Sequence, residues 1–500
     1  MLRRFLNTKR SPYSPAFFSG LLLVVCQPPL SQFYLAYAAL VPLLFSLEAG
    51  KDRLNFLKGF AAGIVAYIGL VYWVVVAMNT FGGISLPFSL MTLCLLALYL
   101  SLFTGCFAWL ISFLDERLHI PFFFSAPPAW ALLEYLRGAL LTGFPWSFLS
   151  HSQYNFLPLI QVVSLTGAYF LSFLIVGVNC LIYHILAKKR FPLVYGAFLI
   201  CMIAACLAFG FHRLKEPIEA GMTASIVQGN ISQDVKFSDA YKASIVRTYS
   251  TLTLSKGRAS DLVVWPETAM PFIFLEDGAS RAICSIPSVL SNHLLLGAIS
   301  RDGRGRLYNT AYVIGKRGNI VADYSKNHLV PFGEYTPLAD YFPFLSQISV
   351  ASGDFFPGPS HDPMRTDIGN IGVLICYEGI FPSITNDTVR RGAEVLVNIT
   401  NDAWFGKSSA PYQHFANYIF RAVETDRYVL RAANTGISAV IDPRGRVCAR
   451  TGIFSQEVLN CAFGLKEGET TYVRYGDWFV LFCGLLLVLA AAWRFLRIAL

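Results

Sequence analysis

Charged residues are scarce in this sequence. Only 14% of its 500 residues are Asp, Glu, Lys or Arg, whereas a soluble globular protein usually carries about 25%. Hydrophobic residues make up 55% of the chain, and the mean hydropathy is +0.50. Because the apolar residues are also clustered in long runs, the composition excludes an ordinary soluble protein. It predicts a polytopic membrane protein with room for a separate soluble domain.

Several ligand-binding motifs are missing. The net charge of +9 does not indicate nucleic acid, because the sequence has no basic face with interleaved aromatics and no zinc-knuckle or RNP-like motif. The sequence contains no P-loop that would indicate nucleotide binding. It also contains no cluster of His and Asp that would indicate a metal site. We therefore expect no cofactor, no metal and no nucleic-acid partner.

The eleven cysteines form no Cys-x-x-Cys pair. Seven of them lie in or beside apolar segments and are expected to be packing residues. The others, in the more polar part of the chain, are Cys284, Cys376, Cys448 and Cys461. Sequence alone leaves open whether any two of these form a disulfide.

Eight apolar segments are candidates for membrane-spanning helices, which need about 20 apolar residues each. The first, second and fifth are short for a span. The segments cover 14–26, 33–47, 56–78, 87–114, 122–136, 157–186, 192–211 and 477–496.

Clusters of basic residues flank these segments on one side. They precede the first segment, separate the second from the third, the fourth from the fifth and the sixth from the seventh, and follow the eighth. The opposite connections "QPPLSQ" and "NTFGGIS" contain none. The positive-inside rule then places both termini in the cytoplasm. An uncleaved first span is preferred to a signal peptide, because no Ala-x-Ala-like site follows Cys26.

These spans divide the chain into three expected parts. Residues 1–212 form a transmembrane domain with seven spans, 213–476 an extracytoplasmic domain, and 477–500 a C-terminal transmembrane helix. In the middle part, β-rich runs such as "DLVVWPE" and "EVLVNIT" alternate with helix-like stretches, notably 414–433. This alternation predicts an α/β layered domain.

Reactive side chains follow three of the β-rich runs. "DLVVWPETAMP" places Glu267 after a strand and a proline turn. "DYSKNHLVPFGEY" contains Lys326 and Glu334, and "GVLICYEGIFP" contains Cys376 and Glu378. A strand end is a rigid mount for a side chain, so these three ends can converge on one cleft.

A Glu, Lys and Cys set is chemically coherent. The thiolate is the nucleophilic form of cysteine, a carboxylate can accept the thiol proton, and an ammonium can stabilise the oxyanion. Acyl transfer through a thioester follows from these roles. Each residue also has a structural interpretation, in which Cys376 is a core residue, Glu267 a solvated turn residue and Lys326 part of an exposed hairpin.

Three motifs carry a resemblance to a known superfamily. "VVWPET", "YSKNHLVPFGEY" and "IGVLICYEGIFP" resemble the Glu-Lys-Cys motifs of the nitrilase (carbon–nitrogen hydrolase) superfamily, whose fold is a four-layer αββα sandwich. With the predicted spans, "GFPW" and "NITNDAWFG", nearly the whole chain resembles the apolipoprotein N-acyltransferase family of bacterial inner membranes.

The resemblance implies roles for individual residues. Glu267 would be the general base, Lys326 the oxyanion stabiliser and Cys376 the nucleophile. Four further residues would support them, with Glu334 orienting the lysine and Asn309 lining the site. These supporting residues are Asn309, Glu334, Tyr377 and Glu378.

The implied activity is N-acylation of lipoproteins. A phospholipid would donate a fatty acyl chain to the cysteine, and the α-amino group of the S-diacylglyceryl-cysteine of an apolipoprotein would accept it. The expected enzyme is a monomer in the inner membrane, contacts membrane lipid and has its catalytic domain on the periplasmic side. The alternatives are a membrane-tethered nitrilase-type amidase and a non-catalytic lipid-binding assembly protein.

An aromatic segment follows Glu334. Exposed apolar residues often mark an interaction surface, so this segment either forms a lid that touches lipid or packs against the domain. The aromatic residues concerned are Tyr341, Phe342, Phe344, Phe355 and Phe356.

Glu134 and Arg137 lie near the end of the fifth apolar segment. A charge at the centre of a membrane-spanning helix costs about 2.5–3.5 kcal/mol on insertion scales. The pair therefore either faces a polar cavity or marks the place where the span ends. The sequence slightly favours the second interpretation.

Overall fold

The computed structural model describes residues 12–257, 260–336 and 355–499, and the chain forms two compact units. One unit is helical and consists of Met1–Val74, Leu90–Lys215 and Tyr475–Leu500. The other consists of Glu216–Arg474 together with Val75–Ser89, a short segment from between two helices of the first unit. In that segment the π-helix η2 (Val76–Phe81) packs against the 3₁₀ helix η8 (Asp402–Phe405).

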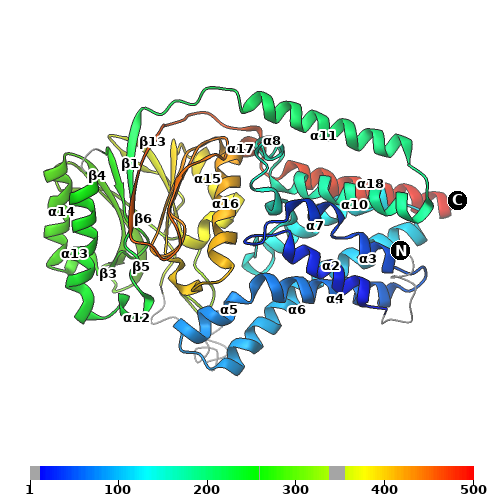
Figure 1. Cartoon of the computed structure of the whole chain (residues 1–500), viewed down its shortest axis with the longest axis horizontal. Helices are drawn as coiled ribbons and strands as arrows, with labels where there is room; N and C mark the ends of the chain where they lie inside the picture. The colour runs from blue at the N-terminus through cyan, green and yellow to red at the C-terminus, as the bar shows by residue number, and fades with distance from the viewer. Residues whose placement is uncertain (1–11, 258–259, 337–354, 500) are drawn as a thin grey trace. The chain divides into compact units, whose positions relative to one another are not determined.

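Long apolar helices dominate the first unit (Figure 1). Among the described residues, five helices are long and apolar enough to cross a membrane. They are α4 (Asp52–Val71), α6 (Leu86–Arg117), α10 (Ala168–Lys188), α11 (Leu193–Arg213) and α18 (Trp478–Ala499).

The other expected spans are shorter or interrupted. The second consists of η1 (Phe33–Ala38) and α3 (Val41–Ser46), while α2 (Ser14–Val25) and α7 (Phe122–Ala139) do not reach the length and hydropathy of the five. The prediction of one continuous helix over 157–186, the sixth expected span, is wrong. It consists of α8 (Leu157–Ile160), α9 (Val163–Thr166) and α10, because Gly167 breaks the helix with a φ of +71°. The number of spans stays a prediction.

The second unit contains two sheets. The first sheet has the strand order β13–β1–β2–β4–β5–β6, with β3 paired to β4, and the second has the order β12–β11–β10–β9–β8–β7. Strands β1, β2 and β4 are mutually parallel, and so are β8, β9 and β10. The first sheet contains β1 (Met222–Gln228), β2 (Leu262–Val264), β3 (Met270–Ile273), β4 (His293–Arg301), β5 (Leu307–Ile314), β6 (Ile320–Ser325) and β13 (Glu457–Phe463). The second contains β7 (Met364–Thr366), β8 (Gly369–Ile375), β9 (Val395–Thr400), β10 (Val429–Ala433), β11 (Ala439–Ile441) and β12 (Val447–Arg450).

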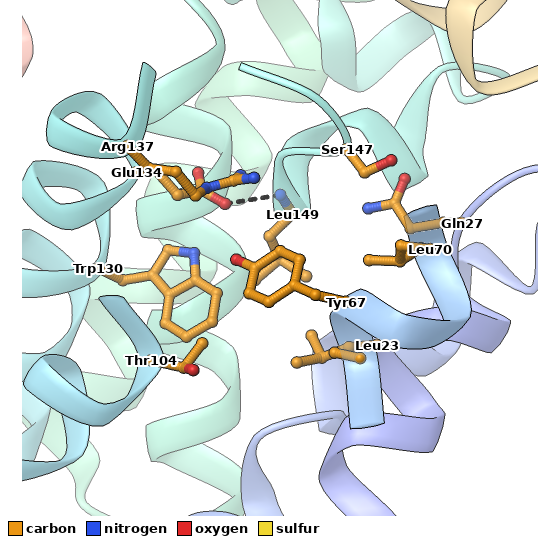
Figure 2. Close-up of a pocket in the computed structure, with 11 residues that line it drawn as sticks. Leu23, Gln27, Tyr67, Leu70, Thr104, Trp130, Glu134, Arg137, Ser147 and Leu149 are labelled. Carbon is orange, nitrogen blue, oxygen red and sulfur yellow. Dashed lines mark hydrogen bonds between the residues drawn. The ribbon is translucent and has the colours of Figure 1, made fainter. Parts of the chain in front are cut away.

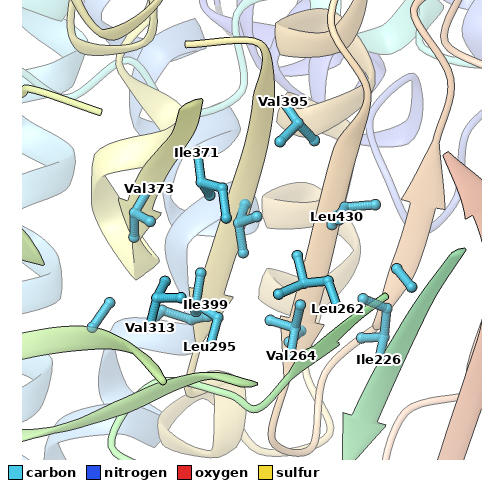
Figure 3. Close-up of a cluster of buried hydrophobic side chains, with 14 of the residues drawn as sticks. Ile226, Leu262, Val264, Leu295, Val313, Ile371, Val373, Val395, Ile399 and Leu430 are labelled. Carbon is cyan, nitrogen blue, oxygen red and sulfur yellow. The ribbon is translucent and has the colours of Figure 1, made fainter. Parts of the chain in front are cut away.

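The two sheets enclose one hydrophobic core (Figure 3). Alternate residues of each strand point into it, as the two-residue period of a strand requires. On β2, Leu262 and Val264 face this core, whereas Val263 faces the opposite side and packs in a second cluster. Because both faces of these strands are buried, their sequences are continuous apolar runs. The core residues labelled in Figure 3 are Ile226, Leu262, Val264, Leu295, Val313, Ile371, Val373, Val395, Ile399 and Leu430.

Helices form the two outer layers of this unit. Figure 1 shows α13 (Asp239–Lys256) and α14 (Ala279–Leu290) on the first sheet, and α15 (Pro382–Arg390) and α16 (Ala410–Thr425) on the second. The arrangement confirms the expected αββα sandwich. The expected helix over 414–433 is wrong in its second half, because Asp426 adopts a left-handed φ of +55° that ends α16 and the chain enters β10.

Truncation of this core should destabilise the sandwich. Leu295 is fully buried between the sheets, so Leu295→Ala should lower the free energy of unfolding by about 3 kcal/mol. The melting temperature of the purified protein in detergent should fall by roughly 6–12 °C. The matched control is Leu275→Ala, since Leu275 is exposed in the same unit and its truncation should change little. Equal shifts for the two variants would contradict this account of the core.

Candidate active site

The three predicted reactive side chains follow strands of both sheets. Lys326 comes directly after β6 and Glu267 follows β2 through Trp265 and Pro266, so both belong to the first sheet. Cys376 comes directly after β8 of the second sheet. The structure brings Lys326 Nζ to 3.8 Å from Glu267 Oε1. The charges of both residues act on the Cys376 thiol, so the three strand ends meet at one site.

Lys326 is buried between two carboxylates. Its side chain is only 1% exposed, and its Nζ lies 2.7 Å from Glu334 Oε2. Burial by itself would lower the pKa of this ammonium, but the charges of Glu334 and Glu267 outweigh that effect and raise it above its ordinary value. Lys326 is therefore a permanent positive charge at neutral pH.

Glu267 is held by contacts from three parts of the chain. Asn309 Nδ2 donates to Glu267 Oε1 at 2.8 Å and to Glu334 Oε1 at 3.1 Å, so it links the two carboxylates. The main-chain N–H of Asn401 donates to Glu267 Oε2 at 2.8 Å. The turn at Glu267 also packs tightly on Gly297, where a Cβ atom would lie 2.7 Å from the Glu267 Cα. These contacts fix the direction of the carboxylate.

Cys376 sits on a strained elbow between β8 and the 3₁₀ helix η7 (Cys376–Ile380). Its φ is +53°, a left-handed conformation that costs a residue other than glycine of order 1–3 kcal/mol. The hydroxyl of Tyr418 donates to the carbonyl oxygen of Cys376 at 2.8 Å and holds this conformation. A side chain at Gly379 would lie 2.2 Å from that hydroxyl, so the elbow requires glycine there.

The Cys376 thiol is protonated at rest. Burial and the negative charge of Glu267 raise its pKa, and the nearby Lys326 ammonium only partly opposes them. A thiol in this state needs a base that takes its proton as it attacks. Glu267 is a carboxylate whose charge acts on this thiol.

Glu378 is a buried anchor of the site. Its Oε1 accepts hydrogen bonds from the Tyr324 hydroxyl at 3.0 Å and from the N–H groups of Asn327 at 2.7 Å and His328 at 3.1 Å. Its Oε2 accepts one from the Ile375 N–H at 2.7 Å. Burial raises the pKa of Glu378, while these N–H groups oppose the shift. Glu378 thereby ties the chain after β6 to the elbow that carries the thiol.

Comparison with known proteins identifies both units. Residues 223–471 match the carbon–nitrogen hydrolase model, and residues 19–181 match the model of the apolipoprotein N-acyltransferase N-terminal domain. The apolipoprotein N-acyltransferase of Geobacter metallireducens is 40% identical over 97% of this chain and 96% of its own. That of Azotobacter vinelandii is 32% identical over 96% of this chain and 94% of its own. The chain belongs to the apolipoprotein N-acyltransferase family.

Solved structures match about half of the chain at lower identity. Saccharomyces cerevisiae Nit3, of the nitrilase superfamily, is 19% identical, with a TM-score of 0.38 over 51% of this chain and 93% of its own. A carbon–nitrogen hydrolase from Helicobacter pylori is 16% identical, with a TM-score of 0.39 over 52% of this chain and 94% of its own.

Two further predicted residues lie around Glu267, Lys326 and Cys376. Tyr377 is partly buried, and its ring stacks on His328 with a centroid distance of 5.9 Å and meets Phe381 edge-on at 5.0 Å. Burial and the charge of Lys326 lower the pKa of His328 to about 4, so this imidazole is neutral. Tyr377 therefore contributes a packing surface beside the thiol, whereas Asn309 contacts both carboxylates directly.

The predicted lid lies mostly outside the described residues, since Tyr341, Phe342 and Phe344 fall in 337–354. The end of the segment is anchored beside the site, because the Phe355 N–H donates to the Glu334 carbonyl at 2.9 Å. The Phe356 ring is 40% exposed. The lid stays a prediction.

A buried charge network behind the thiol was not predicted. Asp402 Oδ2 pairs with Arg431 at 2.7 Å, and Asp402 Oδ1 with His414 at 2.9 Å. Burial would raise the pKa of Asp402, but Arg431 and His414 outweigh it and lower that pKa to about 2. His414 Nε2 lies 3.4 Å from the Tyr418 hydroxyl, which holds the Cys376 carbonyl. The signal available in the sequence was the Asn-Asp pair after the buried strand in "NITNDAWFG".

Glu134 and Arg137 are both buried in the helical unit, although α7 does end soon after them, at Ala139. They line a small cavity with Gln27, Tyr67 and Trp130, among others (Figure 2). Glu134 Oε1 accepts the Leu149 N–H at 2.7 Å, and Arg137 donates to the Trp146 carbonyl at 2.8 Å. The preferred interpretation is borne out in that the helix ends two residues after Arg137. The pair is also buried, lines this cavity and supplies hydrogen bonds to the chain that follows the helix.

The raised thiol pKa predicts a distinct pH profile. The rate of Cys376 alkylation by iodoacetamide, followed on the peptide that contains it, should keep rising up to at least pH 9.5, because deprotonation limits the reaction. An unperturbed cysteine levels off near its pKa of about 8.5. Free N-acetylcysteine, alkylated in parallel, serves as the unperturbed reference. A Cys376 rate that levels off at or below pH 8.5 would contradict the assignment of a protonated resting thiol.

Proposed function

We propose that this chain is a phospholipid:apolipoprotein N-acyltransferase with Glu267, Lys326 and Cys376 as its catalytic residues. The observation that supports this most is the convergence of a buried ammonium, an oriented carboxylate and a strained, protonated thiol at three strand ends. The names of the relatives, which the chain matches along nearly its whole length, supply the reaction class.

In the first step, Cys376 Sγ attacks the ester carbonyl of a phospholipid. Glu267 takes the thiol proton, and the Lys326 ammonium stabilises the negative charge that develops on the carbonyl oxygen. The bond between the carbonyl carbon and the glycerol oxygen then breaks, and the Glu267 proton passes to that oxygen. A lysophospholipid leaves, and the acyl chain stays on Cys376 as a thioester.

In the second step, the α-amino group of an S-diacylglyceryl-cysteine attacks the thioester. A free α-amino group has a pKa of about 7.7–8.0, so much of it is neutral near pH 8. Glu267 takes a proton from the attacking nitrogen, the C–S bond breaks and the sulfur regains a proton. The products are an amide on the lipoprotein and the free Cys376 thiol.

The membrane arrangement suits substrates with acyl chains. Drawing such chains out of lipid costs about 0.8 kcal/mol per CH₂, and an enzyme with several long apolar helices avoids that cost. The positive-inside pattern supports a location in the bacterial inner membrane, with both termini cytoplasmic and the sandwich on the periplasmic side. We expect a monomer that takes phospholipid as donor and diacylglyceryl apolipoproteins as acceptors.

Intact-mass spectrometry tests the thioester. Purified protein incubated with phospholipid alone should gain the mass of one acyl chain, and Cys376→Ala should gain none. Glu267→Gln should slow adduct formation by about 10²–10⁴-fold, as expected for loss of a general base. Cys284→Ala is the matched control, because Cys284 is a partly buried thiol on α14, away from the triad.

The second substrate separates the alternatives. Added diacylglyceryl peptide should discharge the adduct to an amide. Discharge to free fatty acid at the same rate with and without peptide would instead support an amidase-type hydrolase. Absence of any adduct, in protein whose Cys376 thiol still alkylates, would sink the two-step scheme and favour a non-catalytic role.

A further inference from the structure

A second lysine is buried at the candidate active site. Lys236 ends the short helix α12 (Gln233–Lys236), which follows β1, and its side chain is only 2% exposed. Its Nζ donates to the main-chain carbonyl of Glu267 at 3.0 Å. Neither the expected catalytic set nor the two steps above give this ammonium a task.

Helix α12 is tied to Glu267 by two routes. The first is the hydrogen bond from Lys236 Nζ to the Glu267 carbonyl. In the second, Asn401 Nδ2 donates to Gln233 Oε1 at 2.9 Å, while the Asn401 N–H donates to the Glu267 carboxylate. Both the main chain and the side chain of Glu267 are thereby fixed from α12, so a change at Lys236 acts on the proposed base.

The charges at the site give Lys236 an electrostatic task as well. Glu267 and Glu334 supply two negative charges, and Lys326 supplies one positive charge. When the Cys376 proton leaves the site, as in alkylation, three anions would face a single ammonium without Lys236. Asp402, the other carboxylate that acts on the thiol, is already paired with Arg431, and Glu378 is satisfied by four donors.

The pKa of Lys236 is consistent with its position beside Glu267 and Cys376. Burial lowers its pKa to about 7, while the charges of Glu267 and Cys376 act to raise it. The one aromatic ring near its ammonium, among the described residues, is Phe237, at 5.9 Å. Because the Cys376 charge favours the ammonium, the thiolate and the protonated Lys236 stabilise one another. This coupling is strongest below about pH 7 and fades as pH rises and Lys236 loses its proton.

We propose that Lys236 is a positioning residue for the Glu267–Cys376 pair. It holds the main chain of the base in place and supplies a second positive charge that stabilises the Cys376 thiolate. Its use in acyl transfer rests on the proposed function, but its effect on the thiol does not.

The test is the pH profile of Cys376 alkylation by iodoacetamide in the full-length protein, in detergent and without lipid substrate. Lys236→Met should alkylate several-fold to about tenfold more slowly than the unmodified protein at pH 6.5, which corresponds to a thiol pKa raised by roughly one unit. The two rates should converge by about pH 10, where Lys236 of the unmodified protein has also lost its charge. Lys236→Arg should stay within about threefold at pH 6.5, where the lysine that it replaces also carries a charge.

Lys256→Met is the matched control, since Lys256 is exposed at the end of α13 and its loss should leave the profile unchanged. If Lys236→Met does not fold, Lys236→Gln removes the charge with a polar side chain and should give the same shift. An unchanged profile in either variant, or a loss of rate that persists at pH 10, would overturn the proposal, the latter by indicating a purely structural role. Because no acyl donor is present, failure of the proposed acyl transfer would leave this result intact.

Discussion

The buried ammonium of Lys326 is the constraint around which the site is arranged. A charge removed from water costs several kcal/mol unless opposite charge and hydrogen bonds compensate it. Glu334 supplies the close partner at 2.7 Å and Glu267 a more distant one at 3.8 Å. The asymmetry fits the proposed roles, because the nearer carboxylate holds the lysine in place while the more distant one is the proposed base.

The carboxylates in turn need their own partners. Asn309 bridges Glu267 and Glu334, and the Asn401 N–H fixes the second oxygen of Glu267. Asn401 directly follows β9 of the second sheet, whereas Asn309 lies on β5 of the first. The hydrogen bonds of the Glu267 side chain therefore join the two sheets at the end of their shared core. The rigidity of that core is what makes the alignment with Cys376 reproducible.

Cys376, the proposed nucleophile, illustrates how backbone strain is maintained. Cys376 keeps a left-handed backbone because several contacts determine it at once: the Tyr418 hydroxyl on its carbonyl, and Glu378 accepting the N–H of the preceding Ile375. Behind Tyr418 lies the His414, Asp402 and Arg431 network, all of it buried. A polar network at this depth is stable only when its members are paired, and the pairing explains why so many charged residues follow or lie within apolar strands.

The sequence determined the composition-level and local features of this protein. Scarce charge and long apolar runs predicted a membrane protein, and side chains placed directly after apolar strands predicted Glu267, Lys326 and Cys376. The membrane prediction and the prediction of these three residues depend on residues that are close in the chain, or on motifs such as "WPE" and "CYE" that carry the family resemblance. The αββα sandwich came from that resemblance.

Only the tertiary structure decided which distant residues share a site. Lys236 lies 31 residues from its partner Glu267, and Asn401 lies 134 residues away. No periodicity marks either as part of the site, because their roles arise from packing between α12 and the ends of strands in two sheets. The role of Glu134 also depends on the fold, because the chain must fold back for the Leu149 N–H to donate to its carboxylate. Helix ends at Gly167 and Asp426 also required the fold, because a left-handed φ is chosen by the backbone's surroundings as well as by the residue itself.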